Sequence, residues 1–127
     1  MRVFRVESSL GTEELHRSLE ELDAVAVRPG MAESLEELEL AFHLARSAFD
    51  KKKNIARKLR YEFLLWLSGT RDISSAMKRT APDGKEFLLI VFSGSKPPAG
   101  FKLKETGLGR HGDPLRLERI SLSRIRS

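Results

Sequence analysis

The chain has 127 residues, no cysteine and a formal net charge of +5, with 40% hydrophobic and 32% charged residues. This length suits one two-layer core, and the missing cysteine excludes disulfides, thiolate nucleophiles and cysteine-bound zinc. No apolar run approaches the roughly 20 residues that span a bilayer, so we expect one soluble domain over residues 1–127 with no membrane partner.

The first thirty residues predict a strand, a helix and a second strand. Residues 2–7 alternate in polarity, as a short strand does. Thr12 is a candidate helix N-cap, and it precedes three leucines on one helical face, Leu15, Leu19 and Leu22. Residues 24–28 favour a strand that ends at the turn Pro29-Gly30.

The clearest helix start is at Ser34. Ser34 and Glu37 have the spacing of a capping box, in which the two residues bond each other's backbone amides. Apolar residues then recur at helical spacing, namely Leu35, Leu38, Phe42, Ala45 and Phe49. The sequence predicts that this stripe faces a core while Glu36, Glu37 and Glu39 face water.

A second stripe with helical spacing follows the run Lys51-Lys52-Lys53, and it comprises Ile55, Leu59, Phe63, Trp66 and Leu67. Ser68-Gly69 ends that helix, and Thr70 is a candidate cap for a third helix through Ile73 and Met77. The third helix is expected to end before the turn at Pro82-Asp83-Gly84.

The remaining chain contains a continuous apolar run and a glycine-rich segment. Residues 87–92 are typical of a strand buried on both faces and central to a sheet. Residues 93–112 predict a flexible loop, whereas residues 113–127 return to the core as a helix or a strand that periodicity does not distinguish. The predicted fold class is α/β (mixed α+β): a small mixed sheet whose central strand is packed by amphipathic helices.

No catalytic or metal-binding motif stands out. His16, His43 and His111 lack a second ligand at metal spacing. Ser93-Gly94-Ser95-Lys96 lacks the preceding glycine of a phosphate-binding loop. We therefore expect no enzyme activity, no metal, no cofactor and no small-molecule substrate, with a small enzyme of unrecognised site as the remaining alternative.

The charge is unevenly distributed along the chain. Residues 1–50 hold 5 Lys or Arg against 11 Asp or Glu, whereas residues 51–127 hold 18 against 7. On an ideal helix, Lys53, Arg57 and Arg60 would form a positive ridge that tracks phosphates, and Lys51, Lys52 and Lys58 would widen it. The competing interpretation is charge that is merely solvated on helix surfaces.

The junction after this helix is a candidate anion site. Ser68-Gly69-Thr70-Arg71 leads into the next helix, whose free amides attract anions. Arg71 is suited to a bidentate phosphate contact. The alternative is a plain connection with Gly69 as a C-cap. Tyr61 is either a base-stacking ring or a packing residue.

Several segments together resemble a known family. They are Ala41–Ala45, the lysine run, Arg57–Leu67, the segment LSGTRDISSAMK that ends at Lys78, the Phe87–Phe92 strand and Leu117–Ile125. In order and spacing they are similar to the small accessory, PRPK-binding (TPRKB-like) subunit of the KEOPS complex, archaeal type. The segment LSGTRDISSAMK is the most specific of them.

The resemblance implies a non-catalytic, cytoplasmic subunit that binds the kinase/ATPase subunit of KEOPS. It also implies that the subunit recruits tRNA by its 3′ CCA tail for N6-threonylcarbamoyladenosine modification. An interaction module that regulates the kinase without binding RNA is the alternative. The scarcity of Asn and absence of Gln suggest a thermophilic source. The candidate tRNA-binding residues are Lys53, Arg57, Lys58, Arg60, Tyr61, Ser68, Gly69, Thr70, Arg71 and Ile73.

Overall fold

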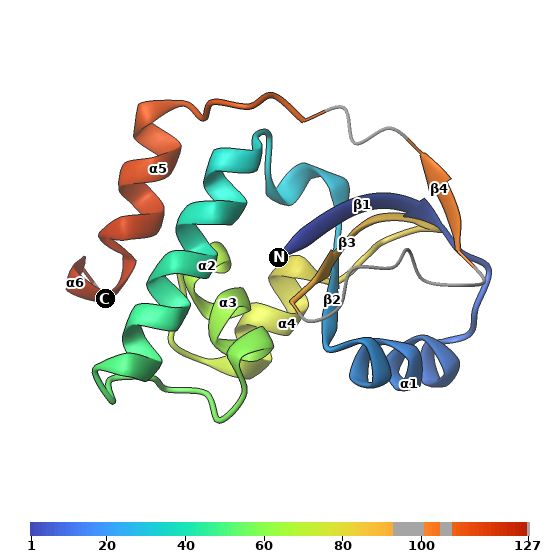
Figure 1. The fold of residues 1–127 in the computed structure, drawn as a ribbon, viewed down its shortest axis with the longest axis horizontal. Helices are drawn as coiled ribbons and strands as arrows, with labels where there is room; N and C mark the ends of the chain where they lie inside the picture. The colour runs from blue at the N-terminus through green and yellow to red at the C-terminus, as the bar shows by residue number, and fades with distance from the viewer. Residues whose placement is uncertain (93–100, 105–107, 127) are drawn as a thin grey trace. The chain divides into compact units, whose positions relative to one another are not determined.

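The computed structural model describes residues 1–92, 101–104 and 108–126, and these form two compact units (Figure 1). The first comprises Met1–Pro29 and Ala81–Gly107, and the second comprises Gly30–Thr80 and Leu108–Ser127. One unit is built on a sheet and the other on helices, so the predicted mixed α/β class is confirmed. The single domain over residues 1–127 stays a prediction.

The first unit contains a four-stranded sheet in the order β2-β3-β1-β4. The strands are β1 (Arg2–Glu7), β2 (Ala24–Val27), β3 (Glu86–Val91) and β4 (Lys102–Lys104). Every pairing is antiparallel, so the sheet is not the mixed one expected from the sequence. β3 lies between β1 and β2, and Phe87 to Val91 are all buried, which confirms the predicted central strand.

Helix α1 (Thr12–Leu22) packs on this sheet. The predicted leucine stripe is confirmed, because Leu15, Leu19 and Leu22 join the cluster around Val6 and Leu89. The N-cap is Gly11 rather than Thr12. Thr12 is already in the helix, so its hydroxyl does not take the capping role.

The segment 93–112 is not one flexible loop. Residues 102–104 pair with β1 as β4, because their backbone groups complete the edge of the sheet. Residues 108–112 are tied to the start of α2, with Gly109 donating to the carbonyl of Glu33 (3.1 Å) and accepting from the amide of Leu35 (2.8 Å). A Cβ on Gly112 would lie 2.8 Å from the Ser34 Oγ, so glycine fits there best. Residues 93–100 and 105–107 lie outside the described residues.

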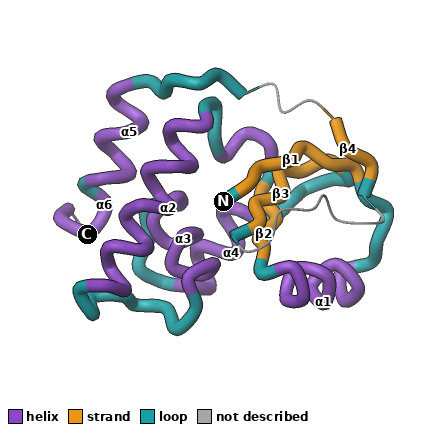
Figure 2. The backbone as a smooth tube through the Cα atoms, viewed as in Figure 1, coloured by secondary structure: helices purple, strands orange, loops and turns teal. Residues whose placement is uncertain are grey.

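The second unit is helical (Figure 2). It contains α2 (Leu35–Asp50), α3 (Leu59–Ser68), α4 (Ile73–Thr80), α5 (Pro114–Ser121) and α6 (Ser123–Arg126), preceded by the short 3-10 helix η1 (Pro29–Met31). The C-terminal segment, for which periodicity allows a helix or a strand, thus forms helices. Asp113 caps α5 by accepting from the Leu115 amide (2.9 Å), and Pro114 suits the first turn.

The Ser34 cap of α2 is confirmed, but Glu37 faces inward and bonds the Glu33 amide and the Ser34 hydroxyl in place of the predicted Ser34 amide. Ser34 Oγ accepts from the Glu37 amide (3.2 Å), while the Glu37 carboxylate accepts from the Ser34 hydroxyl and the Glu33 amide (2.9 Å each). Glu37 is only 1% exposed, so its predicted position in water is wrong. The reason is Arg116 of α5, whose Nε donates to Glu37 (2.6 Å).

This bonding changes the acidity of Glu37. Burial alone raises the pKa of a carboxyl, but the hydrogen bonds from Arg116, the Glu33 amide and Ser34 hold the pKa of Glu37 below its usual value. The carboxylate is therefore charged at neutral pH and links α2 to α5.

Candidate nucleic-acid interface

The basic loop, defined as residues 51–58, connects α2 to α3 and is not helical. The predicted helix through Ile55 is therefore wrong, because α3 begins only at Leu59, with Lys58 as its N-cap. Lys53 and Arg57 lie in the loop, so they do not form a helical ridge with Arg60. Local polar bonds compete with the helix here: the Asn54 side chain donates to the Ala56 carbonyl (2.8 Å), and Lys52 is left-handed (φ 57°).

The basic loop is held in place by a buried carboxylate, that of Glu62 in α3. Glu62 is 0% exposed. Its Oε1 accepts from the amides of Ile55 and Ala56 (2.9 Å each), and its Oε2 accepts from Trp66 Nε1 (3.2 Å). Bonds from backbone amides to an ionised carboxylate are among the stronger ones in proteins. Glu62 therefore fixes the path of the loop against α3.

Arg124 of α6 supplies the charge opposite Glu62. Its guanidinium donates to the Glu62 carboxylate and to the Lys53 carbonyl (3.3 Å), and it stacks over the Trp66 ring at 4.2 Å. Arg71 in turn donates to the Arg124 carbonyl. The C-terminal helix α6 thereby ties both the basic loop and the α3–α4 junction to α3.

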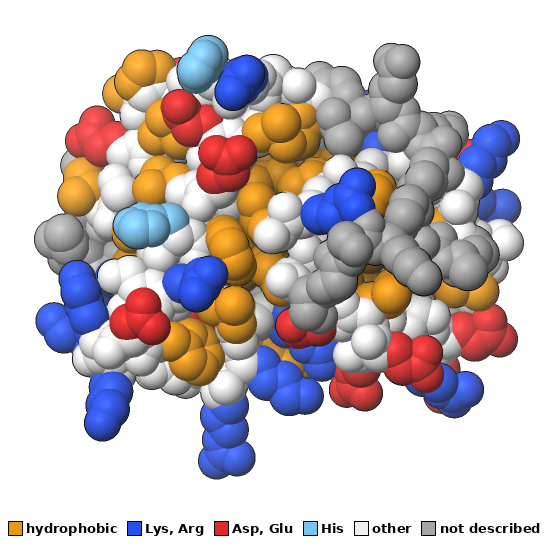
Figure 3. Space-filling view, in the orientation of Figure 1, with side chains coloured by type: hydrophobic (Ala, Val, Ile, Leu, Met, Phe, Trp, Pro, Cys, Tyr) orange, Lys and Arg blue, Asp and Glu red, His pale blue; other side chains and the backbone are white. Residues whose placement is uncertain are grey.

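Within the basic loop the cationic side chains are exposed, and they are Lys51, Lys52, Lys53, Arg57 and Lys58. In Figure 3 several Lys and Arg side chains project from the edge where Figure 1 places the α2–α3 connection. The apolar side chain of Ile55 lies among them and is 45% exposed. Positive charge around an exposed apolar side chain suits single-stranded nucleic acid, which offers both phosphates and base faces.

Two predicted residues of this surface have other roles. Arg60 is 4% exposed, and its guanidinium lies 4.8 Å from the Tyr61 ring centroid. Arg60 is therefore a packing residue and not part of an exposed ridge. Tyr61 is half-buried, and Arg60 covers one face of its ring, which removes that face from base stacking.

The α3–α4 junction is a capped connection. Gly69 has φ 73°, the left-handed conformation of a helix C-cap, and its amide donates to the Leu65 carbonyl (3.0 Å). Asp72 caps α4, because its carboxylate accepts from the amide and hydroxyl of Ser75 (2.9 and 2.8 Å). Thr70 is not the cap, since its Oγ1 accepts from the Asp72 amide (3.2 Å).

The cap at α4 changes the predicted anion site. The Ser75 amide, one of the free amides that the sequence assigned to a bound anion, donates to the chain's own carboxylate, that of Asp72. What remains exposed beside it is Arg71 and the side chain of Ile73, which is 40% exposed. An exposed charged side chain and an exposed apolar one are therefore two positions apart at this junction, as Ile55 and Arg57 are in the basic loop.

The Asp72 cap predicts a pH effect on stability. The pKa of Asp72 lies below its usual value, because the Ser75 hydroxyl and then the Ser75 amide donate to the carboxylate. The cap therefore stabilises the folded protein fully when the pH is above 3.8, the pKa of this carboxyl in the unfolded chain. This stabilisation is lost as the pH falls through the lower pKa of the folded protein. We expect Asp72→Ala to melt below the wild type at pH 7, with a gap that narrows toward pH 2. Thermal melts of both proteins across this range check it, and a gap that stays constant would contradict it.

Sequence reasoning missed three arginines that meet around the end of α3, namely Arg79, Arg116 and Arg119. The spacing of Arg116 and Arg119 places them on one helical face, but only once residues 114–121 are known to be helical. Of the candidate tRNA-binding residues predicted from the sequence, only Ser68 and Gly69 line the same pocket as these arginines.

The described residues show no group of three His, Asp or Glu side chains placed to hold a metal ion. Within the same residues, no helix is long and apolar enough to cross a membrane.

A known protein matches the chain in a comparison of sequences. It is the KEOPS complex subunit Cgi121 of Pyrococcus abyssi (strain GE5 / Orsay), which is 35% identical over 81 residues. The chain is thus similar to an archaeal KEOPS subunit. The resemblance seen in the sequence is confirmed by this match, which covers 64% of the chain and 47% of the Cgi121 protein. The chain therefore matches about half the length of this relative, and no protein-family model matches it.

Proposed function

We propose that this chain is a non-catalytic accessory subunit of a KEOPS-type complex. In this role it binds the kinase/ATPase subunit and recruits tRNA for threonylcarbamoyladenosine modification. The similarity to an archaeal KEOPS subunit supports membership of such a complex. The observation that carries the RNA part is the basic loop, whose exposed cations flank the exposed Ile55 in the sequence while Glu62 holds the backbone.

The proposed RNA contact combines two parts of the second unit. The basic loop supplies phosphate contacts through Lys53, Arg57 and Lys58. The α3–α4 junction supplies Arg71 and the exposed Ile73. A single-stranded end such as the 3′ CCA tail presents unstacked bases and flexible phosphates, which suits alternating charged and apolar contacts better than a duplex does.

Filter binding with two forms of one tRNA tests the tail contact. Intact tRNA is expected to bind more tightly than the same tRNA without its CCA tail, because the tail contributes the base contacts. A duplex of equal length serves as the control for phosphate contacts alone. Equal affinity for the two tRNA forms would refute tail recognition.

Co-purification with the kinase/ATPase subunit tests the other half of the proposal. We expect the wild-type chain and a variant with Lys53→Glu and Arg57→Glu to bring down equal amounts of kinase. If tRNA binding is absent in both proteins while the kinase is retained, the chain is a protein-interaction module without direct RNA binding.

A further inference from the structure

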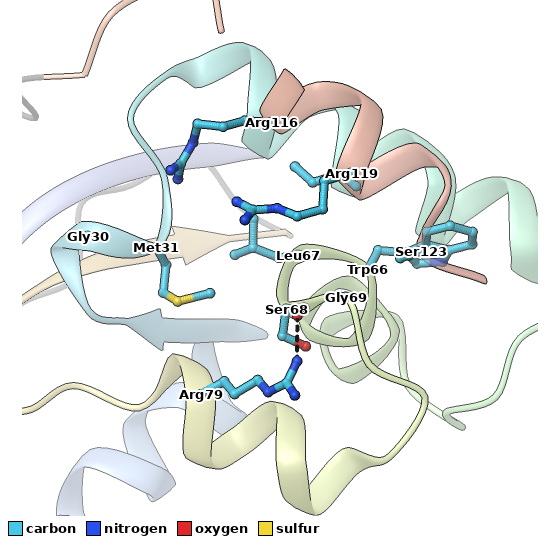
Figure 4. Close-up of a pocket in the computed structure, with 11 residues that line it drawn as sticks. Gly30, Met31, Trp66, Leu67, Ser68, Gly69, Arg79, Arg116, Arg119 and Ser123 are labelled. Carbon is cyan, nitrogen blue, oxygen red and sulfur yellow. Dashed lines mark hydrogen bonds between the residues drawn. The ribbon is translucent and has the colours of Figure 1, made fainter. Parts of the chain in front are cut away.

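A pocket of about 540 Å³ lies at the C-terminal end of α3, entirely within the second unit (Figure 4). We call it the arginine pocket. Figure 4 shows Arg116 and Arg119 extending from α5 toward its centre, with Arg79 on the α4 side. The pocket is lined by Gly30, Met31, Trp66, Leu67, Ser68, Gly69, Arg79, Arg116, Arg119, Ile120 and Ser123.

The three arginines differ in how far their charge is neutralised. Arg116 is paired with Glu37 (2.6 Å) and lies 3.7 Å from a Glu33 oxygen. Among the described residues, Arg79 donates only to a neutral group, the Ser68 carbonyl (3.3 Å). The exposed side chain of Arg119 has no hydrogen bond or ion pair to any described residue. None of the described residues that line the pocket is acidic, so its described lining carries uncompensated positive charge.

The rest of the lining is partly apolar. Met31, Leu67 and Ile120 contribute hydrocarbon surface. The Ser68 and Ser123 side chains add hydroxyl groups that donate or accept hydrogen bonds. A volume of about 540 Å³ falls in the usual range for pockets that hold small organic molecules. The pocket therefore combines a positively charged side with a partly apolar surface.

We propose that the arginine pocket binds the phosphate group of a nucleotide, with the sugar or base against the apolar lining. A guanidinium group presents paired N–H donors that match phosphate oxygens in geometry. A terminal phosphate has three oxygens and up to two negative charges, so it can bind several guanidinium groups at once. A single carboxylate, by contrast, is fully paired by one guanidinium group. The pocket does not include Lys53, Arg57 or Ile55, so it does not depend on the RNA contact proposed above.

Calorimetric titration of the full chain with adenosine monophosphate tests this site. The wild type is expected to bind the nucleotide saturably at low salt and adenosine at least about tenfold more weakly, since the phosphate supplies the charged contacts. Arg119→Ala and Arg79→Ala are expected each to weaken nucleotide binding about tenfold. Arg116 is left intact because it supports Glu37.

Arg17→Ala, in the exposed part of α1, is the matched control and should bind like the wild type. If the wild type does not bind adenosine monophosphate saturably, or if Arg119→Ala binds it as well as the wild type does, the proposal is wrong. Circular dichroism of each variant checks that it is folded. If Arg119→Ala does not fold, Arg79→Ala provides the second test.

A competition experiment identifies the source of the phosphate once binding is established. If tRNA displaces adenosine monophosphate one for one, the pocket takes a nucleotide of the RNA. If both bind together, it takes a free nucleotide. Both results retain the pocket. The basic-loop variant should bind adenosine monophosphate like the wild type in either case, because Lys53 and Arg57 do not line the pocket.

Discussion

Replacing Glu62 with Gln is expected to lower the free energy of unfolding by about 3 kcal/mol. The carboxylate is 0% exposed and accepts four hydrogen bonds, two from loop amides, one from Trp66 and one from Arg124. Glutamine retains the shape but leaves the Arg124 guanidinium without a counter-charge and turns an NH₂ group toward donors. Removing one partner of a buried ion pair in this way costs more than the pair contributes by itself.

Urea unfolding of the two proteins measures this loss directly. Glu39→Gln is the matched control, because Glu39 is exposed on α2 and its replacement should change stability by less than about 0.5 kcal/mol. A loss below about 1 kcal/mol for Glu62→Gln would show that the carboxylate does not hold the loop. Arg124→Met alone should also destabilise the protein, and the double variant should lose less than the sum of the two.

The role of Glu62 explains why the predicted ridge was wrong. The sequence places Glu62 among apolar residues of a helix, where a carboxylate is normally turned to water. Its burial depends on Arg124, which lies 62 positions further along the chain. No local sequence pattern indicates such a distant partner. The backbone amides of Ile55 and Ala56 donate to the same carboxylate instead of forming the hydrogen bonds of a helix.

The elements that were predicted correctly depend on local chemistry. The Ser34 cap, the left-handed Gly69 and the apolar run of β3 each follow from residues within a few positions of one another. Glu37 shows the limit of that reasoning. The sequence predicted its part in the cap of α2, but it did not predict that the side chain is buried against Arg116. The arginine pocket was missed for the same reason, since it joins α4 and α5 across the fold.

Reversing two charges of the basic loop, with Lys53→Glu and Arg57→Glu together, is expected to weaken tRNA binding by roughly tenfold to a hundredfold. Each change removes one cation from beside a phosphate and adds a repulsion. Both side chains are exposed, and Lys53 takes part in the loop's bonding through its carbonyl, which the substitution leaves in place. Stability should therefore change little, in contrast to Glu62→Gln.

The salt dependence of binding separates a direct phosphate contact from general attraction. The plot of log affinity against log salt should become shallower by about one for each phosphate that the variant no longer neutralises. Arg17→Glu together with Arg28→Glu makes the same change in net charge within the first unit, away from the basic loop in the chain. Such a variant should bind tRNA with nearly the wild-type slope. If it weakens binding and flattens the slope as much as the loop variant does, the chain attracts tRNA through its overall charge, and the basic loop is not the contact.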